Sequence, residues 1–136
     1  MAGPPLLQPG RFLGEVDDLS ALYRAGDIFV LPTLYDPFSN ACLEALASGM
    51  PVVTTSANGF SEIMTEGVHG SIVHGKIDAV AEAIRYWSNA ERREDARPVI
   101  LELAAKYDIS RNVARTLEIL FQEARAESTS GKIWKT

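Results

Sequence analysis

Short apolar runs alternate with segments of helical periodicity over residues 11–90. The run Ile28–Leu31 is apolar throughout and is ended by Pro32. Four successive apolar residues indicate a strand covered on both faces, as in the centre of a parallel sheet. Further strands are expected at 11–14, 51–55 and 71–73, and helices from Asp17 or Asp18 to about Ala25, over 40–48, over 60–66 and from Asp78. This alternation predicts a doubly wound α/β sheet.

The end of the chain has a different pattern, with helical periodicity from about Arg92 to Ala126. We expect these helices to pack on the sheet, with apolar stripes at Leu101, Ala104 and Ala105 and at Val113, Leu117, Leu120 and Phe121. The expected organisation is an irregular leader over residues 1–10, one domain over 11–126 and a flexible tail over 127–136.

Composition narrows the class of protein. A chain of 136 residues suffices for one domain with a core, and 46% hydrophobic residues indicate a globular fold. The net charge of −5 removes the usual electrostatic argument for a nucleic-acid partner. The single cysteine, Cys42, fits a reducing compartment. The first residues do not resemble a signal peptide, and no apolar run approaches the roughly 20 residues that span a bilayer, so we expect a cytoplasmic protein.

Candidate chemistry is concentrated in residues 35–51. Asp36 and Glu44 have seven residues between them, in a loop and helix that follow the Ile28–Leu31 strand. In an open α/β sheet, ligands bind at the carboxyl ends of the strands, and a helix N-terminus favours phosphate. A carboxylate such as Glu44 can accept two hydrogen bonds from a ribose diol, and Asp36 lies nearer a sugar beyond the phosphates. The alternative is ordinary: an aspartate in a turn and a glutamate on a solvated helix.

The same residues resemble a known family. Residues 27–33, 36–55 and 58–63, with Gly67-Val68-His69-Gly70 and the helix from Asp78, resemble the C-terminal domain of retaining family 4 glycosyltransferases, the glycosyl transferases group 1 domain. The resemblance covers about residues 11–125. It implies a GT-B architecture, in which two Rossmann-like domains face each other across a cleft. This chain would then be a partial Rossmann-like doubly wound parallel sheet of about three to four strands with a helical C-terminal extension.

The resemblance also implies roles for individual residues. Such enzymes move a sugar from a nucleotide diphosphate donor to an acceptor with retention, and this domain binds the donor. Asp36 matches the first acidic residue of the family's signature, which contacts the donor sugar, and would be the catalytic residue. Glu44 matches the second, which holds the ribose. The segment Pro37-Phe38-Ser39-Asn40 would meet the diphosphate and sugar through backbone N–H groups, and Glu62 would lie near the sugar.

Part of the family pattern has no counterpart. The family uses an arginine and a lysine, on and after the first strand of this domain, to neutralise the diphosphate; Arg11 and Arg24 do not fit those positions. The matching region begins at what looks like the third strand. We therefore expect the Ile28–Leu31 edge to be bare, with the segment around Phe12 either pairing with it directly or contributing to a homodimer.

Several hypotheses about function follow. The first is the donor side of a glycosyltransferase using a UDP-, GDP- or ADP-sugar, with a missing acceptor domain or partner chain. The second is a non-catalytic nucleotide-sugar-binding or interaction module, and the third is a nucleotide-sugar epimerase-like domain. No cofactor is expected, and no metal, because there is no aspartate–x–aspartate pair and His69 and His74 lack ligands at metal-binding spacing.

Overall fold

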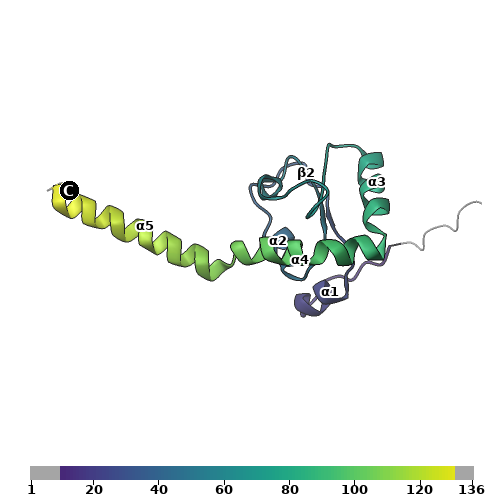
Figure 1. Cartoon of the computed structure of the whole chain (residues 1–136), viewed down its shortest axis with the longest axis horizontal. Helices are drawn as coiled ribbons and strands as arrows, with labels where there is room; N and C mark the ends of the chain where they lie inside the picture. The colour runs from purple at the N-terminus through teal and green to yellow at the C-terminus, as the bar shows by residue number, and fades with distance from the viewer. Residues whose placement is uncertain (1–9, 131–136) are drawn as a thin grey trace, which may run out of the picture.

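A computed structural model describes residues 10–130, including side chains except at 109–112, 124 and 126–130. The described chain is an α/β fold with a long C-terminal helix that extends away from the rest (Figure 1). Its elements are α1 (Leu19–Ala25), β1 (Phe29–Leu31), α2 (Asn40–Ala47), β2 (Val52–Thr55), the 3₁₀ helix η1 (Gly59–Ile63), β3 (Gly70–Val73), α3 (Ile77–Trp87), α4 (Ala90–Lys106) and α5 (Ile109–Ser130).

The three strands form one parallel sheet in the order β1-β2-β3. Phe29 lies beside Val52, and Val52 lies beside Gly70. Three parallel strands following one another in this way make up one half of a doubly wound sheet. The prediction of a partial parallel α/β sheet is therefore confirmed.

Helices cover both faces of the sheet. On one face, α2 and α4 enclose a core that includes Cys42, Leu46, Val52, Phe60 and Ile100. On the other face, α3 packs Ala83 and Trp87 against Val53 and Val73. Trp87 is fully buried, and its indole Nε1–H donates to Ser71 Oγ at 3.0 Å. The alternation of inward residues along each strand produces these two separate cores.

Two predictions about β1 are corrected. Residues 11–14 form no strand, and Phe12 is fully exposed with a relative accessibility of 102%. Within residues 10–130, β1 is an edge strand, as the resemblance predicted and not central as its apolar run alone indicated, and its three residues are only partly buried. Continuous apolar character indicated burial on both faces, but it does not show whether a neighbouring strand is present. Direct pairing of the Phe12 segment with β1 is thus wrong.

The helix that carries the candidate site begins and ends where the sequence predicts. Ser39 is the N-cap of α2, and its Oγ accepts the Cys42 N–H at 3.4 Å. Gly49 follows the helix with a φ of +81°, and its N–H donates to Leu46 O at 2.8 Å. These are the side-chain cap and left-handed residue that satisfy helix termini.

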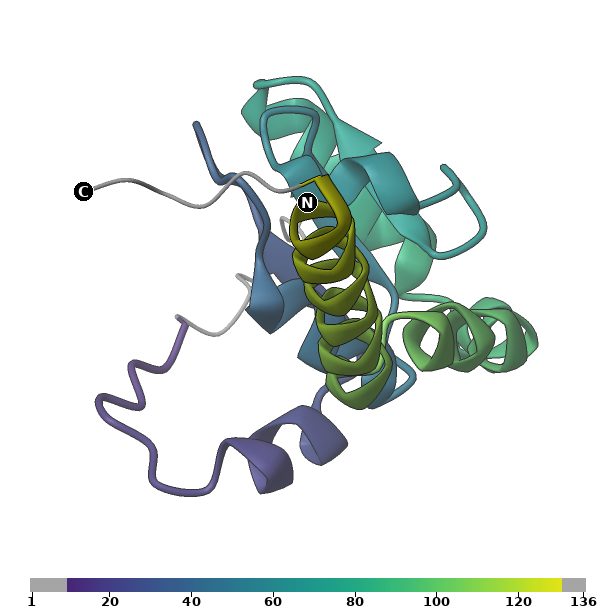
Figure 2. The same cartoon turned by 90° about the vertical axis from the view of Figure 1, so that its left-hand side faces the viewer.

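The C-terminal helices differ from the expectation. α4 packs on α2, whereas α5 projects from the body of the molecule in Figure 1 and points toward the viewer, in front of the body, in Figure 2. The expected stripe of Val113, Leu117, Leu120 and Phe121 is exposed to solvent. α5 also continues to Ser130, four residues into the segment expected to be a tail. α3 begins at Ile77, so Asp78 lies in its first turn. No helix among the described residues combines the length and apolar character needed to cross a bilayer.

His69 links stability to pH. Burial lowers its pKa below the usual 6.5, nearby Lys106 lowers it further and Glu102 opposes the change. Its Nδ1 accepts the Thr65 N–H at 2.9 Å, which a protonated Nδ1 could not do. Because the unfolded chain binds this proton more readily, the contribution of His69 is complete above pH about 6.5 and falls as the pH drops.

We therefore expect His69→Gln to reduce the loss of unfolding free energy between pH 7 and pH 5. Urea unfolding across this range, with both proteins also measured at pH 8, tests the expectation. Parallel curves for the two proteins would show that His69 does not contribute.

Candidate functional site

The candidate site lies where the strands end. Because the sheet is parallel, the segments that follow β1, β2 and β3 all leave it at the same end, the carboxyl end of the strands. Asp36 to Asn40 follow β1, and Asn58 to Glu62 follow β2. The structure therefore brings together the residues of the predicted loop and the turn that carries Glu62.

Asp36 organises the loop through its side chain and its backbone. Its Oδ1 accepts the Phe38 N–H at 3.0 Å, which closes a turn of the type that aspartate favours. Its own N–H donates to Ala57 O at 3.2 Å, and its carbonyl accepts the Gly59 N–H at 2.8 Å. These bonds attach the loop after β1 to the turn after β2.

Close packing also holds the loop after β1 against the turn after β2. A Cβ atom placed on Gly59 would lie 1.9 Å from Pro37 O, so the turn can approach the loop only because residue 59 is glycine. The rings of Phe38 and Phe60 meet edge to face with centroids 5.5 Å apart. Phe60 is fully buried, which anchors the more exposed Phe38.

Asn58 is a buried polar residue whose sequence context indicates only a turn. Its side chain is 0% exposed, and its Oδ1 accepts the Phe60 N–H at 3.0 Å. Its Nδ2 donates to Thr54 Oγ1 at 3.0 Å and to Cys42 Sγ at 3.6 Å. Thr54 Oγ1 donates in turn to Leu31 O at 2.9 Å. The network connects β1, β2, α2 and η1 beneath the loop.

The N-terminus of α2 faces the end of this loop. Ser39 is buried, and it caps the helix through both its hydroxyl and its carbonyl. Within residues 10–130, the N–H groups of Asn40 and Ala41 have no hydrogen-bond acceptor, as is usual in a first helical turn. The Phe38 N–H, by contrast, is engaged by Asp36.

Glu44 lies one turn further along α2 and is exposed. It lines a cavity of about 590 Å³ between α2 and α4, together with Asn40, Leu43, Leu101 and Tyr107. Burial raises the pKa of the Tyr23 phenol, and the charge of Glu44 and a hydrogen bond to it raise that pKa further. Asp36 does not line this cavity. The two carboxylates of the motif therefore lie in different surroundings, and Tyr23 is a neighbour of Glu44 that the sequence did not indicate.

Other candidate groups are placed as follows. Glu62 is exposed in the first turn of η1, directly after the Asn58–Gly59 turn. Burial raises the pKa of the Cys42 thiol, which disfavours the reactive thiolate. His74 Nδ1 lies 3.1 Å from Ser56 Oγ. Among the described residues, no group of three or more His, Cys, Asp or Glu side chains is arranged to hold a metal ion.

Known proteins resemble this chain in sequence. Residues 7–89 match the family described as glycosyl transferases group 1. A glycogen synthase of Mycobacterium tuberculosis is 32% identical over 129 residues, covering 90% of this chain and 31% of that protein. The lipopolysaccharide core biosynthesis mannosyltransferase LpsB of Rhizobium meliloti is 35% identical over 117 residues, covering 85% of this chain and 31% of its own.

Solved structures resemble it in fold. WaaG, a glycosyltransferase involved in lipopolysaccharide biosynthesis, superposes with a TM-score of 0.62 at 22% identity, over 69% of this chain and 26% of WaaG. The chain thus spans about a third or less of the length of these proteins.

Proposed function

Because this chain belongs to the glycosyl transferases group 1 family, we propose that it is the donor-binding side of a retaining glycosyltransferase that uses a nucleotide diphosphate sugar. One observation carries the proposal: the Asp36 loop and the N-terminus of α2 are held together at the carboxyl end of β1, in the position where open α/β sheets bind ligands. Glycogen synthase and the mannosyltransferase LpsB are sugar-transferring relatives that support the assignment.

The donor diphosphate would lie at the N-terminus of α2. The open N–H groups of Asn40 and Ala41, and the partial positive charge of the helix end, favour an anion there. Negative charge builds on the diphosphate as the sugar leaves, so fixed donors at this position would stabilise the transition state. The Phe38 N–H could donate to the phosphate only if a phosphate oxygen replaced Asp36 Oδ1 as its acceptor.

Glu44 would hold the ribose. Its carboxylate is exposed, so two hydroxyl groups could reach it, and the cavity beside it extends to Asn40 at the start of the helix. A ribose bound to Glu44 would therefore be continuous with a diphosphate at the helix N-terminus.

Asp36 and Glu62 would lie nearer the transferred sugar. Asp36 is held by its turn beside Phe38, and Glu62 begins η1 on the adjoining segment. A carboxylate next to the anomeric carbon would stabilise the positive charge that develops there as the leaving bond breaks.

The residues of the proposed site carry negative charge only, which limits the chemistry they can perform alone. Asp36, Glu44 and Glu62 are acidic, and the arginine and lysine implied by the resemblance have no match in this sequence. This observation favours a second candidate, a nucleotide-sugar-binding module without turnover. Turnover would need cationic groups such as the arginine and lysine of the family pattern, and an acceptor site from an acceptor domain or a partner chain.

Calorimetric titration with UDP-, GDP- and ADP-glucose tests the ribose assignment. We expect Glu44→Ala to weaken binding by about 1–3 kcal/mol, the effect of losing charge-assisted hydrogen bonds. The same substitution should have little effect on binding of a 2′,3′-dideoxy nucleotide. Glu82→Ala, which removes an exposed glutamate from α3, is the matched control.

Two results would contradict this proposal. Lack of binding of any nucleotide diphosphate at millimolar concentration would remove the proposed ligand. Equal affinity of Glu44→Ala and the unaltered chain for the preferred donor would remove Glu44 from the ribose site.

A further inference from the structure

Tyr23 connects α1 to Glu44, the proposed ribose ligand on α2. Its phenol hydroxyl donates a hydrogen bond to the Glu44 carboxylate. The phenol is half-buried, whereas Glu44 is exposed. A carboxylate has about four acceptor positions on its two oxygens, so one bond to a phenol leaves the others free. The contact therefore fixes the carboxylate without removing its capacity to accept ribose hydroxyl groups.

The ring of Tyr23 is itself fixed by packing. It lies against the buried core that includes Cys42 and Met50, and its centroid is 5.9 Å from that of Phe29 in β1. The end of α1 also lies close to this core, since a Cβ atom on Gly26 would be 2.7 Å from Met50 Sδ. A tyrosine has only two rotatable side-chain bonds, so a packed ring presents its hydroxyl as a rigid donor.

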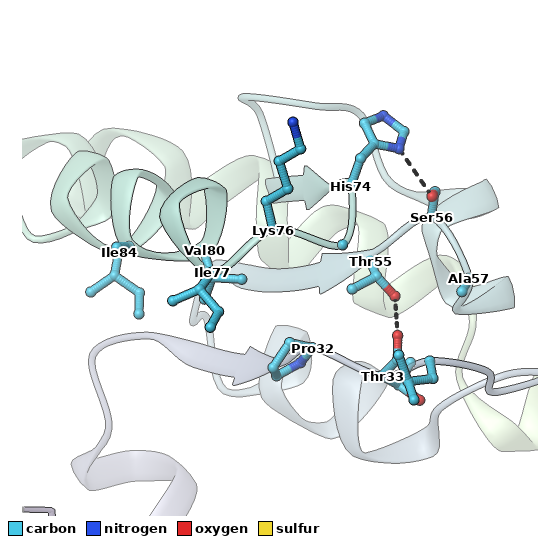
Figure 3. Close-up of a pocket in the computed structure, with 13 residues that line it drawn as sticks. Pro32, Thr33, Thr55, Ser56, Ala57, His74, Lys76, Ile77, Val80 and Ile84 are labelled. Carbon is cyan, nitrogen blue, oxygen red and sulfur yellow. Dashed lines mark hydrogen bonds between the residues drawn. The ribbon is translucent and has the colours of Figure 1, made fainter.

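Glu44 is directed toward the place where the diphosphate would bind. Helical side chains lean toward the helix N-terminus, and Asn40 lies one turn before Glu44 on the same face of α2. Both residues line the cavity of about 590 Å³ between α2 and α4. The larger cavity drawn in Figure 3 is a different one, lined by the segments that follow the strands and by α3.

We propose that Tyr23 is a positioning residue for donor binding, a role that rests on the proposed function of Glu44 as the ribose ligand. The phenol hydroxyl holds one carboxylate oxygen, so the carboxylate is already oriented when the 2′- and 3′-hydroxyl groups of the donor arrive. An exposed glutamate without such a partner would lose side-chain freedom on binding, and this loss would reduce the affinity.

Tyr23→Phe tests the role of the hydroxyl, because phenylalanine keeps the ring that packs on the core. We expect this variant of the full chain to bind the preferred donor among UDP-, GDP- and ADP-glucose about three- to tenfold more weakly in calorimetric titration. Binding of the 2′,3′-dideoxy analogue should not change, because it lacks the hydroxyl groups that Glu44 would accept. Tyr86→Phe, which removes a partly exposed phenol hydroxyl from α3, is the matched control and should bind the donor normally.

A double-mutant cycle shows whether Tyr23 acts through Glu44. In the Glu44→Ala background, Tyr23→Phe should have no further effect on donor affinity, since the carboxylate that it orients is gone. Additive effects of the two substitutions, or an unchanged affinity in Tyr23→Phe, would overturn the proposal. Tighter donor binding by Tyr23→Phe would overturn it as well, because the phenol would then be competing with the ribose for the carboxylate.

A measurement without ligand distinguishes this proposal from the ribose assignment on which it rests. In NMR of the chain labelled with ¹³C-tyrosine, the Tyr23 signal is the one lost in Tyr23→Phe, and its titration reports the pKa of the phenol. Burial raises that pKa above the usual value of about 10, the charge of Glu44 and the hydrogen bond to it raise it further, and Cys42 adds to the effect. Glu44→Gln should therefore lower the pKa of Tyr23.

The two failures have different signatures. An unchanged pKa of Tyr23 in Glu44→Gln would overturn the positioning contact, whatever the affinity of Glu44 for the ribose. A lowered pKa in a chain that binds no nucleotide diphosphate at millimolar concentration would overturn the ribose site, and the positioning role with it. Donor binding that is weakened by Glu44→Ala but not by Tyr23→Phe would retain the ribose site and remove only Tyr23.

Discussion

Replacing Gly59 with alanine is expected to displace the Asp36 loop and to lower the free energy of unfolding by about 2–4 kcal/mol. The new Cβ would lie 1.9 Å from Pro37 O and 2.9 Å from its carbonyl carbon, and backbone atoms cannot give way as a flexible side chain can. Relief requires the loop to move, which breaks the 2.8 Å bond from Gly59 N–H to Asp36 O and separates Phe38 from Phe60.

The effect arises from crowding rather than from backbone conformation. Gly59 does not have a positive φ, so alanine could adopt its dihedral angles. Gly75→Ala is the matched control, because Gly75 has a φ of +48° but no atom within 4 Å of a new Cβ. That control should cost about 1 kcal/mol from conformation alone and leave the loop in place.

Donor titration and urea unfolding of both variants provide the measurement. Gly59→Ala should lose nucleotide-sugar binding beyond what its stability explains, because the displaced loop carries Asp36 and leads into the N-terminus of α2. Equal stability and equal donor affinity in Gly59→Ala and the unaltered chain would show that the contact between loop and turn does not position the site.

Sequence predicts the local parts of this site because their signals lie close together in the chain. The cap residue Ser39, the helix and Gly49 are separated by only a few residues, so propensity and capping suffice to identify α2. The apolar runs likewise identify all three strands, because a strand in a covered parallel sheet has little polar character.

Features that depend on contacts between distant segments are not indicated by these local signals. The apolar run of β1 by itself indicated a central strand, and only the resemblance predicted its bare edge, because such a run does not show which strands lie beside it. Residues 11–14 form no strand although their composition allows one. α5 has the apolar stripe of a packed helix, yet Leu117 and Leu120 are exposed. Tyr23 reaches Glu44 from a different helix, so no spacing within the motif indicates it.

Asn58 shows why local chemistry and tertiary role can diverge. An asparagine before glycine is a common turn signal, and it does form a turn here. Its side chain, however, is buried between α2, β2 and η1, where it bonds to groups that are near it only in the fold. A sequence pattern records the turn but not those partners.

The buried position of Asn58 leads to the second prediction, in which Asn58→Ala lowers the free energy of unfolding by about 2–3 kcal/mol. Removing the amide leaves the Phe60 N–H without its acceptor and Thr54 Oγ1 without its donor, in a place that water does not reach. Asn89→Ala is the matched control. Asn89 Oδ1 caps α4 by accepting the Arg92 N–H at 2.9 Å, but Asn89 is exposed, so water can replace the cap at a cost of about 1 kcal/mol.

A double-mutant cycle between Asn58→Ala and Thr54→Val separates the network from simple loss of volume. If the two side chains act as one network, the double variant should be less destabilised than the sum of the single variants, because each single change already leaves the other group unpaired. Chemical denaturation of the four proteins measures this coupling. Additive effects, or a loss in Asn58→Ala no greater than in Asn89→Ala, would show that Asn58 acts only as a helix cap. The expected coupling would instead mean that the bond from Thr54 to Leu31 O and the turn that holds Asp36 are parts of one buried support.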